Sequence, residues 1–356
     1  MPDPLRLTAF SHGAGCACKL GPADLSTVLG ALGSTAMPEE VLVSADTGDD
    51  AAAWQLPDGR ALIATVDVFT PIVDDAYDWG RIAATNAFSD VYAMGGVPAM
   101  ALNVAGWPVD DLPLELLGRV LQGGQDVASD AGAVVVGGHT ITATEPIYGM
   151  VAIGFAERGA LMRNATAAPG EHLFLTKPIG LGMISTAIKR GTATEEQTGA
   201  AVRTMTTLNA AAAAAMVEAG SAAATDVTGF GLLGHLRKLL EASGVAARID
   251  ASAVPLLPGV LGLAQQGVVA GGTQRNHAWL GATTDWGALT KPEQLVLADA
   301  QTSGGLLIAT RHADALAAAL DARGVSHAQI GEIVAGEPGG VVVEGRLSAQ
   351  PGTTPE

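Results

Sequence analysis

Two patterns of apolar residues alternate along the first half of the chain. Short runs rich in Val, Ile and Ala predict strands at residues 61–69, 99–107, 133–140 and 147–155. Longer stretches with helical spacing lie between them, at residues 78–96 and 112–132. Strands that alternate with helices in this way are typical of an α/β unit.

A second set of elements follows a break in this pattern. The polar stretch 157–171, which contains Gly and Pro, separates the two sets. Beyond it, apolar runs predict strands at residues 172–180, 306–310, 328–334 and 340–344. Helices are expected at residues 194–220, 231–243 and 313–324, each ended by a glycine or a polar turn. The sequence therefore predicts a second α/β unit.

This break predicts a domain boundary near residue 157. We expect an N-terminal domain over residues 1–157, whose leading 50 residues or so are turn-rich and form a mobile arm. A C-terminal domain follows over residues 158–346, and the Pro- and Thr-containing tail 347–356 is expected to be disordered. A length of 356 residues fits two domains, because single cores stop growing near ~250–300 residues.

Composition and charge exclude several classes of partner. The chain is 48% hydrophobic and 15% charged, which suits packed cores, and no apolar stretch approaches the ~20 residues of a membrane span. Its net charge of −17 gives no basic surface for nucleic acid. The first residues show no basic leader followed by an apolar stretch. We therefore expect a cytoplasmic protein that binds neither nucleic acid nor membrane.

Carboxylates supply the first candidate chemistry. Asp49 and Asp50 stand in a predicted turn, Asp67 in a strand, Asp90 on a helix and Asp226 in a Gly-rich turn. Taken singly, turn aspartates are most often caps that satisfy backbone N–H groups. An aspartate inside Val-Asp-Val is different, because its burial costs free energy unless it is paired or binds a cation.

The spacing of these residues points to a magnesium–nucleotide site. Asn86 and Asp90 are four residues apart and share one helical face, from which both can approach the ligand of Asp67. Several carboxylates without accompanying His or Cys ligands suit a hard cation, and Mg²⁺ is commonly shared between carboxylates and phosphates. No Walker loop is present, since Lys19 follows Cys18 and precedes Leu20. The Gly-rich segments 134–140 and 175–183 are weak alternatives for phosphate contact.

Both cysteines of the chain lie close to a lysine. Lys19 would lower the pKa of a neighbouring thiol, which would make Cys16 or Cys18 a nucleophile. A C-x-C metal or redox pair, or two incidental surface thiols, explains the spacing equally well. Among the histidines, His139 is expected in a loop among the candidate ligands, whereas His235 is more simply explained as a helix or surface residue.

Taken together, several longer stretches resemble the selenophosphate synthetases, also called selenide, water dikinases. The matching stretches are LTAFSHGAGCACKLGP, TGDDAA, GRIAATNAFSDVYAMGG, VVVGGHTITATEPIYG, LFLTKPIGLG, ATDVTGFGLLGHL, VPLLPGV, GGTQRN and QTSGGLL. They run in order from about residue 5 to about residue 345. This family resembles aminoimidazole ribonucleotide synthetase, which implies an α+β (mixed α/β) two-domain fold whose N-terminal sheet forms the core of a homodimer.

The resemblance also implies a reaction and its residues. ATP, selenide and water would give selenophosphate, AMP and phosphate, with Mg²⁺ as cofactor. Cys16 would be the active-site residue that handles selenium, and Lys19 would lie at the ATP phosphates. The implied magnesium ligands are Asp50, Asp90 and Asp226. The implied nucleotide contacts are Lys19, Thr47, Gly48, Asp49, Asp67, Asp90, Gly138, His139 and Thr140.

One position departs from the common family pattern. Many members have Gly between the two cysteines, where this chain has Ala17, whose methyl group restricts the backbone. Two other functions compete with the dikinase. A relative that acts on an amide or thiocarboxylate would not need GAGCACK, and a non-catalytic thiol or metal-binding protein would form no AMP from ATP and selenide.

Overall fold

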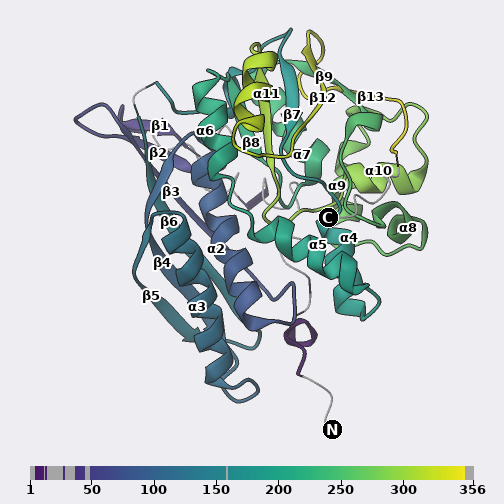
Figure 1. Ribbon diagram of the computed structural model, residues 1–356. Helices are drawn as coiled ribbons and strands as arrows, with labels where there is room; N and C mark the ends of the chain where they lie inside the picture. Colours follow the sequence, from purple (N-terminus) through teal and green to yellow (C-terminus); the bar gives the residue numbers. More distant parts are fainter. Residues whose placement is uncertain are drawn as a thin grey trace.

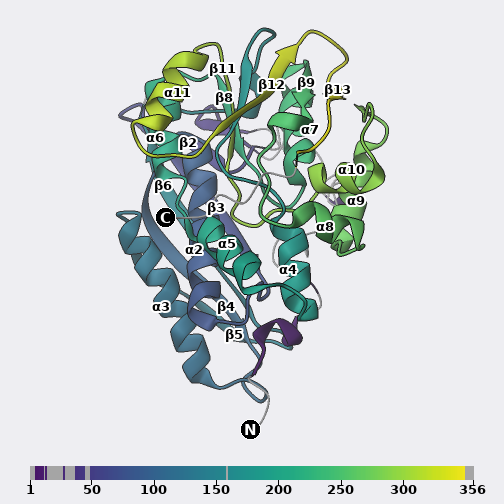
Figure 2. The same cartoon turned by 45° about the vertical axis from the view of Figure 1, so that its right-hand side comes forward.

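The computed structural model describes residues 5–11, 13, 27–28, 37–44, 49–157 and 159–348. Two β-sheets, each with its own helices, form two layered units that lie side by side (Figures 1 and 2). None of the helices in these ranges is both long and apolar enough to cross a membrane. The mixed α+β architecture predicted from the sequence is confirmed.

The N-terminal sheet has six strands in the order β1-β2-β3-β6-β4-β5. Its strands are β1 (Val41–Val43), β2 (Ala52–Gln55), β3 (Ala61–Phe69), β4 (Val97–Trp107), β5 (Val134–Thr142) and β6 (Ile147–Ala156). Only the edge pair β4–β5 is parallel; the other neighbours in this sheet are antiparallel. The four strands predicted here from apolar runs are β3, β4, β5 and β6, with ends within about two residues.

Helices α2 (Ala76–Ala93) and α3 (Leu114–Asp130) cover one face of this sheet (Figure 1). The Asp75 side chain caps α2 by accepting a hydrogen bond from the backbone N–H of Asp78. The two helices cross so closely that a Cβ atom on Gly80 would lie 2.0 Å from the carbonyl oxygen of Val120. Glycine at this crossing is therefore what lets α2 and α3 pack together.

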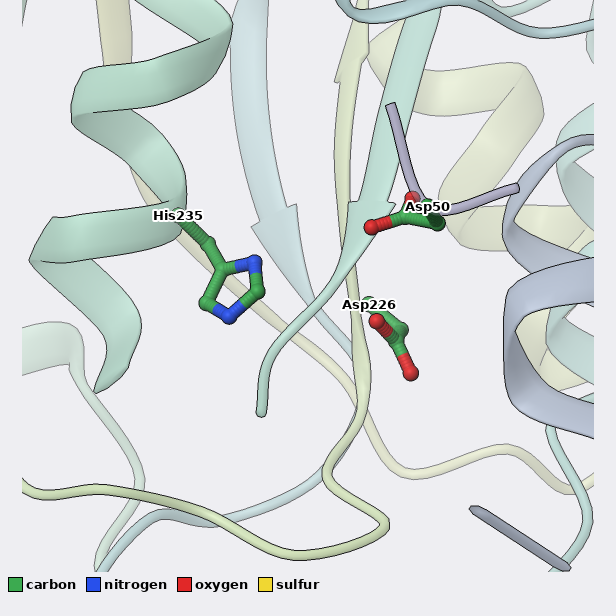
Figure 3. Close-up of side chains that lie close together, drawn as sticks. All are labelled: Asp50, Asp226 and His235. Carbon is green, nitrogen blue, oxygen red and sulfur yellow. The ribbon is translucent and has the colours of Figure 1, made fainter. Parts of the chain in front are cut away.

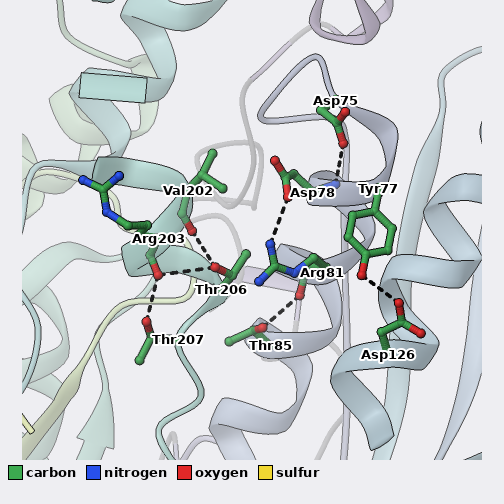
Figure 4. A network of polar contacts seen from close by, with 10 residues as sticks. All are labelled: Asp75, Tyr77, Asp78, Arg81, Thr85, Asp126, Val202, Arg203, Thr206 and Thr207. Atoms are coloured by element: carbon green, nitrogen blue, oxygen red, sulfur yellow. Dashed lines mark hydrogen bonds and ion pairs between the residues drawn. The ribbon is translucent and has the colours of Figure 1, made fainter. Parts of the chain in front are cut away.

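Helix α2 also touches the C-terminal unit, because α5 packs along its other side (Figure 4). The Tyr77 hydroxyl of α2 donates to Asp126 of α3 at 2.7 Å. Arg81 pairs with Asp78, one turn earlier on α2, at 3.1 Å. The Tyr77 bond holds α2 against α3, and the packing of α5 holds it against the C-terminal unit. A rigid α2 matters because it carries Asn86 and Asp90.

The opposite face of the N-terminal sheet is apolar and open. Val66, Val134 and Ile141 are 61%, 59% and 56% exposed. Along β3 the residues alternate, with Ile63 and Asp67 buried towards α2 and Val66 directed away from it. A sheet face of this kind is unusual on an isolated chain.

The C-terminal sheet has seven strands in the order β10-β13-β9-β12-β7-β11-β8. Its strands are β7 (His172–Leu175), β8 (Ala223–Asp226), β9 (Ala246–Asp250), β10 (Thr284–Asp285), β11 (Leu306–Thr310), β12 (Ala328–Val334) and β13 (Val341–Glu344). Its helices are α4 (Leu181–Arg190), α5 (Glu195–Thr206), α6 (Ala210–Glu218), α7 (Gly231–Ser243), α8 (Val260–Gln265), α9 (Gly271–Leu280), α10 (Lys291–Leu297) and α11 (Ala313–Asp321). The pairing is mixed, parallel at β10–β13 and β13–β9 and antiparallel elsewhere.

The single helix predicted over residues 194–220 is wrong, because the chain forms two helices there, α5 and α6. At the break, the carbonyl of Thr207 and the side-chain amide of Asn209 form hydrogen bonds with residues outside these two helices. Lys177 Nζ donates to the carbonyl of Thr207 at 2.7 Å. Asn209 donates to Ser89 Oγ of α2 and to the carbonyl of Gly304. These bonds favour the break over a continuous helix, although the residues have good helical propensity.

Part of the predicted N-terminal arm is anchored in the structure. Leu7 and Thr8 are buried in a short 3₁₀ helix, Leu7–Phe10. Thr8 donates to Asp74 through both its backbone N–H and its hydroxyl. Lys189 of α4 donates to the carbonyl of Ser11 at 2.5 Å. This stretch therefore bridges the two units.

Candidate active site

Two carboxylates are held between β3 and α2. The Asn86 amide donates to Asp67 Oδ2 at 2.5 Å, and the Thr65 hydroxyl donates to Asp90 Oδ2 at 2.5 Å. Thr65 and Asp67 are two apart on the strand, while Asn86 and Asp90 are one turn apart on the helix. As the spacing predicted, Asn86 and Asp90 lie on one face of the helix. Asp67 is buried among apolar residues, and the Asn86 amide is the polar partner that lowers the cost of burying it.

A second acidic group joins the two units. Asp50, two residues before β2, lies near Asp226 and His235, so that one ligand atom of each falls within 4.8 Å of the others (Figure 3). Asp226 is the last residue of β8 and pairs with Leu306 of β11, so its prediction in a turn was wrong. Its strand runs Ala-Ala-Thr-Asp, which is too short to stand out as a period in the sequence.

The electrostatics of this group favour a cation. Burial, and then the nearby Asp226 carboxylate, raise the pKa of Asp50 well above its ordinary value, while hydrogen bonds from Thr225 and from the Asp226 backbone oppose the shift. Thr225 Oγ1 donates to Asp50 Oδ1 at 2.8 Å. A divalent cation between two carboxylates would relieve their repulsion. Carboxylate oxygens are donors that suit Mg²⁺, and magnesium binding at Asp50 and Asp226 stays a prediction.

Asp49 accepts a hydrogen bond from a different residue than Asp50 does. Its Oδ1 accepts the backbone N–H of Asn164, in the segment that leads into the C-terminal unit, at 2.6 Å. The two neighbouring aspartates therefore divide their contacts: Asp50 faces Asp226, and Asp49 fastens the connection between the units. Of these two aspartates, Asp50 is the one with a potential metal-ligand atom within 4.8 Å of those of Asp226 and His235.

The segment 301–305 contacts both Asn86 and Lys177. The backbone N–H of Ser303 donates to Asn86 Oδ1 at 2.8 Å, and Lys177 Nζ donates to the Ser303 carbonyl at 3.0 Å. Ser303 adopts φ of 53°, the only non-glycine with positive φ among the residues described. Burial lowers the pKa of Lys177 to about 7, and the charge of Asp226 opposes that shift. Lys177 and Ser303 were not predicted as site residues, although both stand in motifs that carry the family resemblance.

His235 was also missed. It lies on α7, nine positions after Asp226, and is buried rather than on the surface. The signal in the sequence was its place one turn into a helix that starts directly after an aspartate-bearing strand. Such a position brings the side chain back towards the end of that strand.

Gly138, His139 and Thr140 lie on β5, the exposed edge strand, and not in a loop. They pair in parallel with Asn103, Val104 and Ala105 of β4. Because paired residues direct their side chains to the same face, His139 lies with Val104 on the open apolar face. Strands β4 and β6 separate β5 from β3, so this segment stands apart from the aspartates within one chain.

In the Gly-rich segment 175–183, the backbone N–H groups that could bind a phosphate already donate to side chains of this chain. The backbone N–H groups of residues 180 and 181 donate to Gln301 Oε1, and those of 182 and 183 donate to Asp299 Oδ2. Side chains of the same chain therefore cap the start of α4. This weak alternative for phosphate contact is wrong.

Several predicted site residues lie outside the described residues. These are Cys16, Cys18, Lys19, Thr47 and Gly48. Their proposed roles come from the sequence alone.

Comparison with known proteins agrees with this architecture. Residues 48–156 match the N-terminal domain of AIR synthase related proteins, and residues 168–344 match the C-terminal domain. A solved structure of tt0281 from Thermus thermophilus has a TM-score of 0.70 at 22% identity, covering 93% of this chain and 98% of that chain. The chain is therefore an AIR synthase related protein with the two-domain fold of that class.

Full-length relatives narrow the class to one family. The selenide, water dikinase of Myxococcus xanthus is 48% identical over 339 residues, covering 94% of this chain and 96% of that protein. The selenide, water dikinase of Pseudomonas putida is 45% identical over 337 residues, covering 94% and 97%. The chain belongs to the selenide, water dikinase family, as the motifs in its sequence indicated.

Proposed function

We propose that the chain makes selenophosphate from ATP, selenide and water. The terminal phosphoryl group of ATP passes to selenide, forming the P–Se bond as the bond to ADP breaks. Water then cleaves the remaining anhydride of ADP, and AMP and phosphate leave. One observation supports the proposal independently of family membership: Asp50 and Asp226, which are 176 positions apart in the sequence, converge beside His235.

The described carboxylates would hold the magnesium of Mg-ATP. Asp50, Asp90 and Asp226 are the proposed ligands, and Asp67 the proposed nucleotide-site carboxylate. Bound Mg²⁺ spreads the negative charge of the transferring phosphoryl group. The chain itself supplies positioning, because Asn86 and Thr65 fix the Asp67 and Asp90 carboxylates at 2.5 Å, and Thr225 fixes Asp50 at 2.8 Å.

The remaining assignments extend the proposal to residues around the nucleotide. Lys19 adds a positive charge at the phosphates, and Cys16 holds selenium for delivery to phosphorus. Thr47, Gly48 and Asp49 contact the nucleotide. We place the two domains at residues 1–157 and 158–346. A cytoplasmic location suits the mechanism, since its thiols and selenide both need a reducing environment.

A homodimer explains the distance between β5 and the aspartates. The open face carries Val66, Val134 and Ile141, whose exposure is relieved if a second copy covers it. His139 lies on that same face. We propose that the face pairs two chains, so that Gly138, His139 and Thr140 of one chain approach the nucleotide bound by the other.

An anaerobic assay with ATP, Mg²⁺ and selenide tests the function. ³¹P NMR should show selenophosphate, AMP and phosphate in equal amounts, and no AMP when selenide is left out. Cys16→Ser should abolish selenide-dependent AMP formation, and Cys18→Ser is the matched control because it removes the neighbouring thiol. ADP as the final product would overturn the dikinase reaction, and full activity of Cys16→Ser would remove that thiol from the mechanism.

A further inference from the structure

His235 makes contacts that fix which of its ring nitrogens carries the proton. Its Nε2 lies 3.2 Å from the backbone nitrogen of Thr228 and 3.4 Å from that of Phe230. The Thr228 hydroxyl, which can donate or accept, also lies 3.2 Å from Nε2, so the two backbone groups decide its role. Both backbone groups are N–H donors and can only donate. Nε2 must therefore accept, which excludes a proton on that atom.

The proton of neutral His235 then belongs on Nδ1. This nitrogen lies 3.4 Å from Thr225 Oγ1, on the side of the ring that faces the two carboxylates (Figure 3). A doubly protonated ring would set an Nε2 proton against two backbone N–H groups, so the neutral Nδ1–H form is favoured. At this distance the bond to Thr225 is long, and the orientation of the ring comes chiefly from the Nε2 side.

The Thr225 hydroxyl connects His235 to Asp50 by hydrogen bonds. Its hydroxyl has one hydrogen, for which Asp50 Oδ1 at 2.8 Å competes with the backbone carbonyl of Asp226 at 3.2 Å. The Asp50 oxygen is the nearer acceptor, so the hydrogen points to Asp50. The hydroxyl oxygen then presents its lone pairs to Nδ1–H. Each donor in the chain has one acceptor, in the order His235, Thr225, Asp50.

We propose that His235 and Thr225 are positioning residues that orient the Asp50 carboxylate towards Asp226 for magnesium binding. The inference rests on the proposed function, for which Asp50 is a magnesium ligand. His235 is then not itself a ligand, because Nε2 is engaged with the turn before α7 and Nδ1 carries a proton. The imidazole ring therefore contacts the turn before α7 on one side and, through Thr225, orients the Asp50 carboxylate on the other.

Two substitutions at Thr225 separate positioning from packing. Thr225→Val keeps the branched shape of this buried residue and removes the hydroxyl, whereas Thr225→Ser keeps the hydroxyl and removes a methyl group. Loss of a hydrogen bond to a charged group should raise the Mg²⁺ concentration for half-saturation roughly 10- to 100-fold in Thr225→Val. At saturating Mg²⁺, kcat should change far less, and Thr225→Ser should recover most of the Mg²⁺ affinity. Weaker Mg²⁺ affinity in Thr225→Ser than in Thr225→Val would overturn the proposal, since packing alone would then explain the site.

Two readouts do not depend on the reaction. Mg²⁺ binding, measured calorimetrically with a non-hydrolysable ATP analogue and no selenide, should weaken in Thr225→Val by the same factor. ¹⁵N NMR of the full chain labelled at histidine should show a protonated Nδ1 and an unprotonated Nε2 for His235, with its signal assigned by its loss in His235→Gln. A proton on Nε2 would overturn the proposal. If wild type binds Mg²⁺ and shows this tautomer but makes no selenophosphate, the proposed function fails and the positioning role stands.

Discussion

Replacing Lys177 with Met should change how stability depends on pH. The amine is buried and donates to the carbonyls of Thr207 and Ser303 at 2.7 and 3.0 Å. Burial lowers its pKa to about 7, against the ordinary 10.5 of lysine. Between these two values the unfolded chain binds the proton more strongly than the folded chain does. The stability of wild type should therefore rise with pH across that window, and the cost of the buried charge is fully present below pH 7.

The magnitude follows from the size of the shift. With a folded pKa of about 7, the free energy of unfolding of wild type should gain roughly 2 kcal/mol from Lys177 between pH 7 and pH 9. Lys177→Met lacks this gain. It also leaves two carbonyl oxygens without their donor, at roughly 1–3 kcal/mol each. The variant should therefore fall further behind wild type as the pH rises.

Urea unfolding at pH 7, 8 and 9, with EDTA and without nucleotide, measures this difference. Lys291→Met is the matched control, because the same substitution is made at an exposed position. The difference in unfolding free energy between wild type and Lys177→Met should widen by roughly 2 kcal/mol over the two pH units. The Lys291→Met curve shows how much of any change comes from removing a lysine at an exposed position. Parallel curves for wild type and Lys177→Met would refute the assignment of a lowered pKa to this amine.

Two further substitutions test the α2 contacts and the open face. Asn86→Leu removes the acceptor of the Ser303 N–H and one donor to Asp67, and should lower the free energy of unfolding by about 2 kcal/mol or more. An unchanged urea midpoint would contradict the role of Asn86 in joining the two units. Val66→Asp places a charge on the open face and should turn a wild-type dimer into a folded monomer. Light scattering measures the oligomeric state, and circular dichroism shows whether the variant is folded. A variant that stays dimeric, or a wild type that is already monomeric, would contradict the proposed pairing.

Local sequence patterns predicted the N-terminal unit well because its strands are long. β3 spans nine residues and β4 eleven, so alternation and β-branched composition are visible within each. The same reasoning located Asp67 in a strand and placed Asn86 and Asp90 on one helical face. Those predictions depend only on residues a few positions apart, and the hydrogen bond from Asn86 to Asp67 agrees with them.

The C-terminal unit was harder to predict because its site is built from short elements and distant contacts. β8 has only four residues, so Asp226 was placed in a turn. His139 was assigned to a loop because two glycines precede it, yet pairing with β4 extends the strand through them. The Gly-rich start of α4 resembled a phosphate loop, and nothing local reveals that Asp299 and Gln301, more than 100 residues away, occupy its N–H groups.

The contacts of α2 show why the two units must be considered together. Asn86 donates to Asp67 in the N-terminal sheet and accepts from Ser303 in the C-terminal unit, so one amide side chain orients a carboxylate and fastens the turn that Lys177 also holds. Asp50 reaches Thr225 of β8 across the same boundary. Any motion that separates the units would break these bonds and move Asp50 away from Asp226. Alignment of the units is therefore a condition for assembling the acidic site, and its stability should limit how firmly the site can hold magnesium and nucleotide.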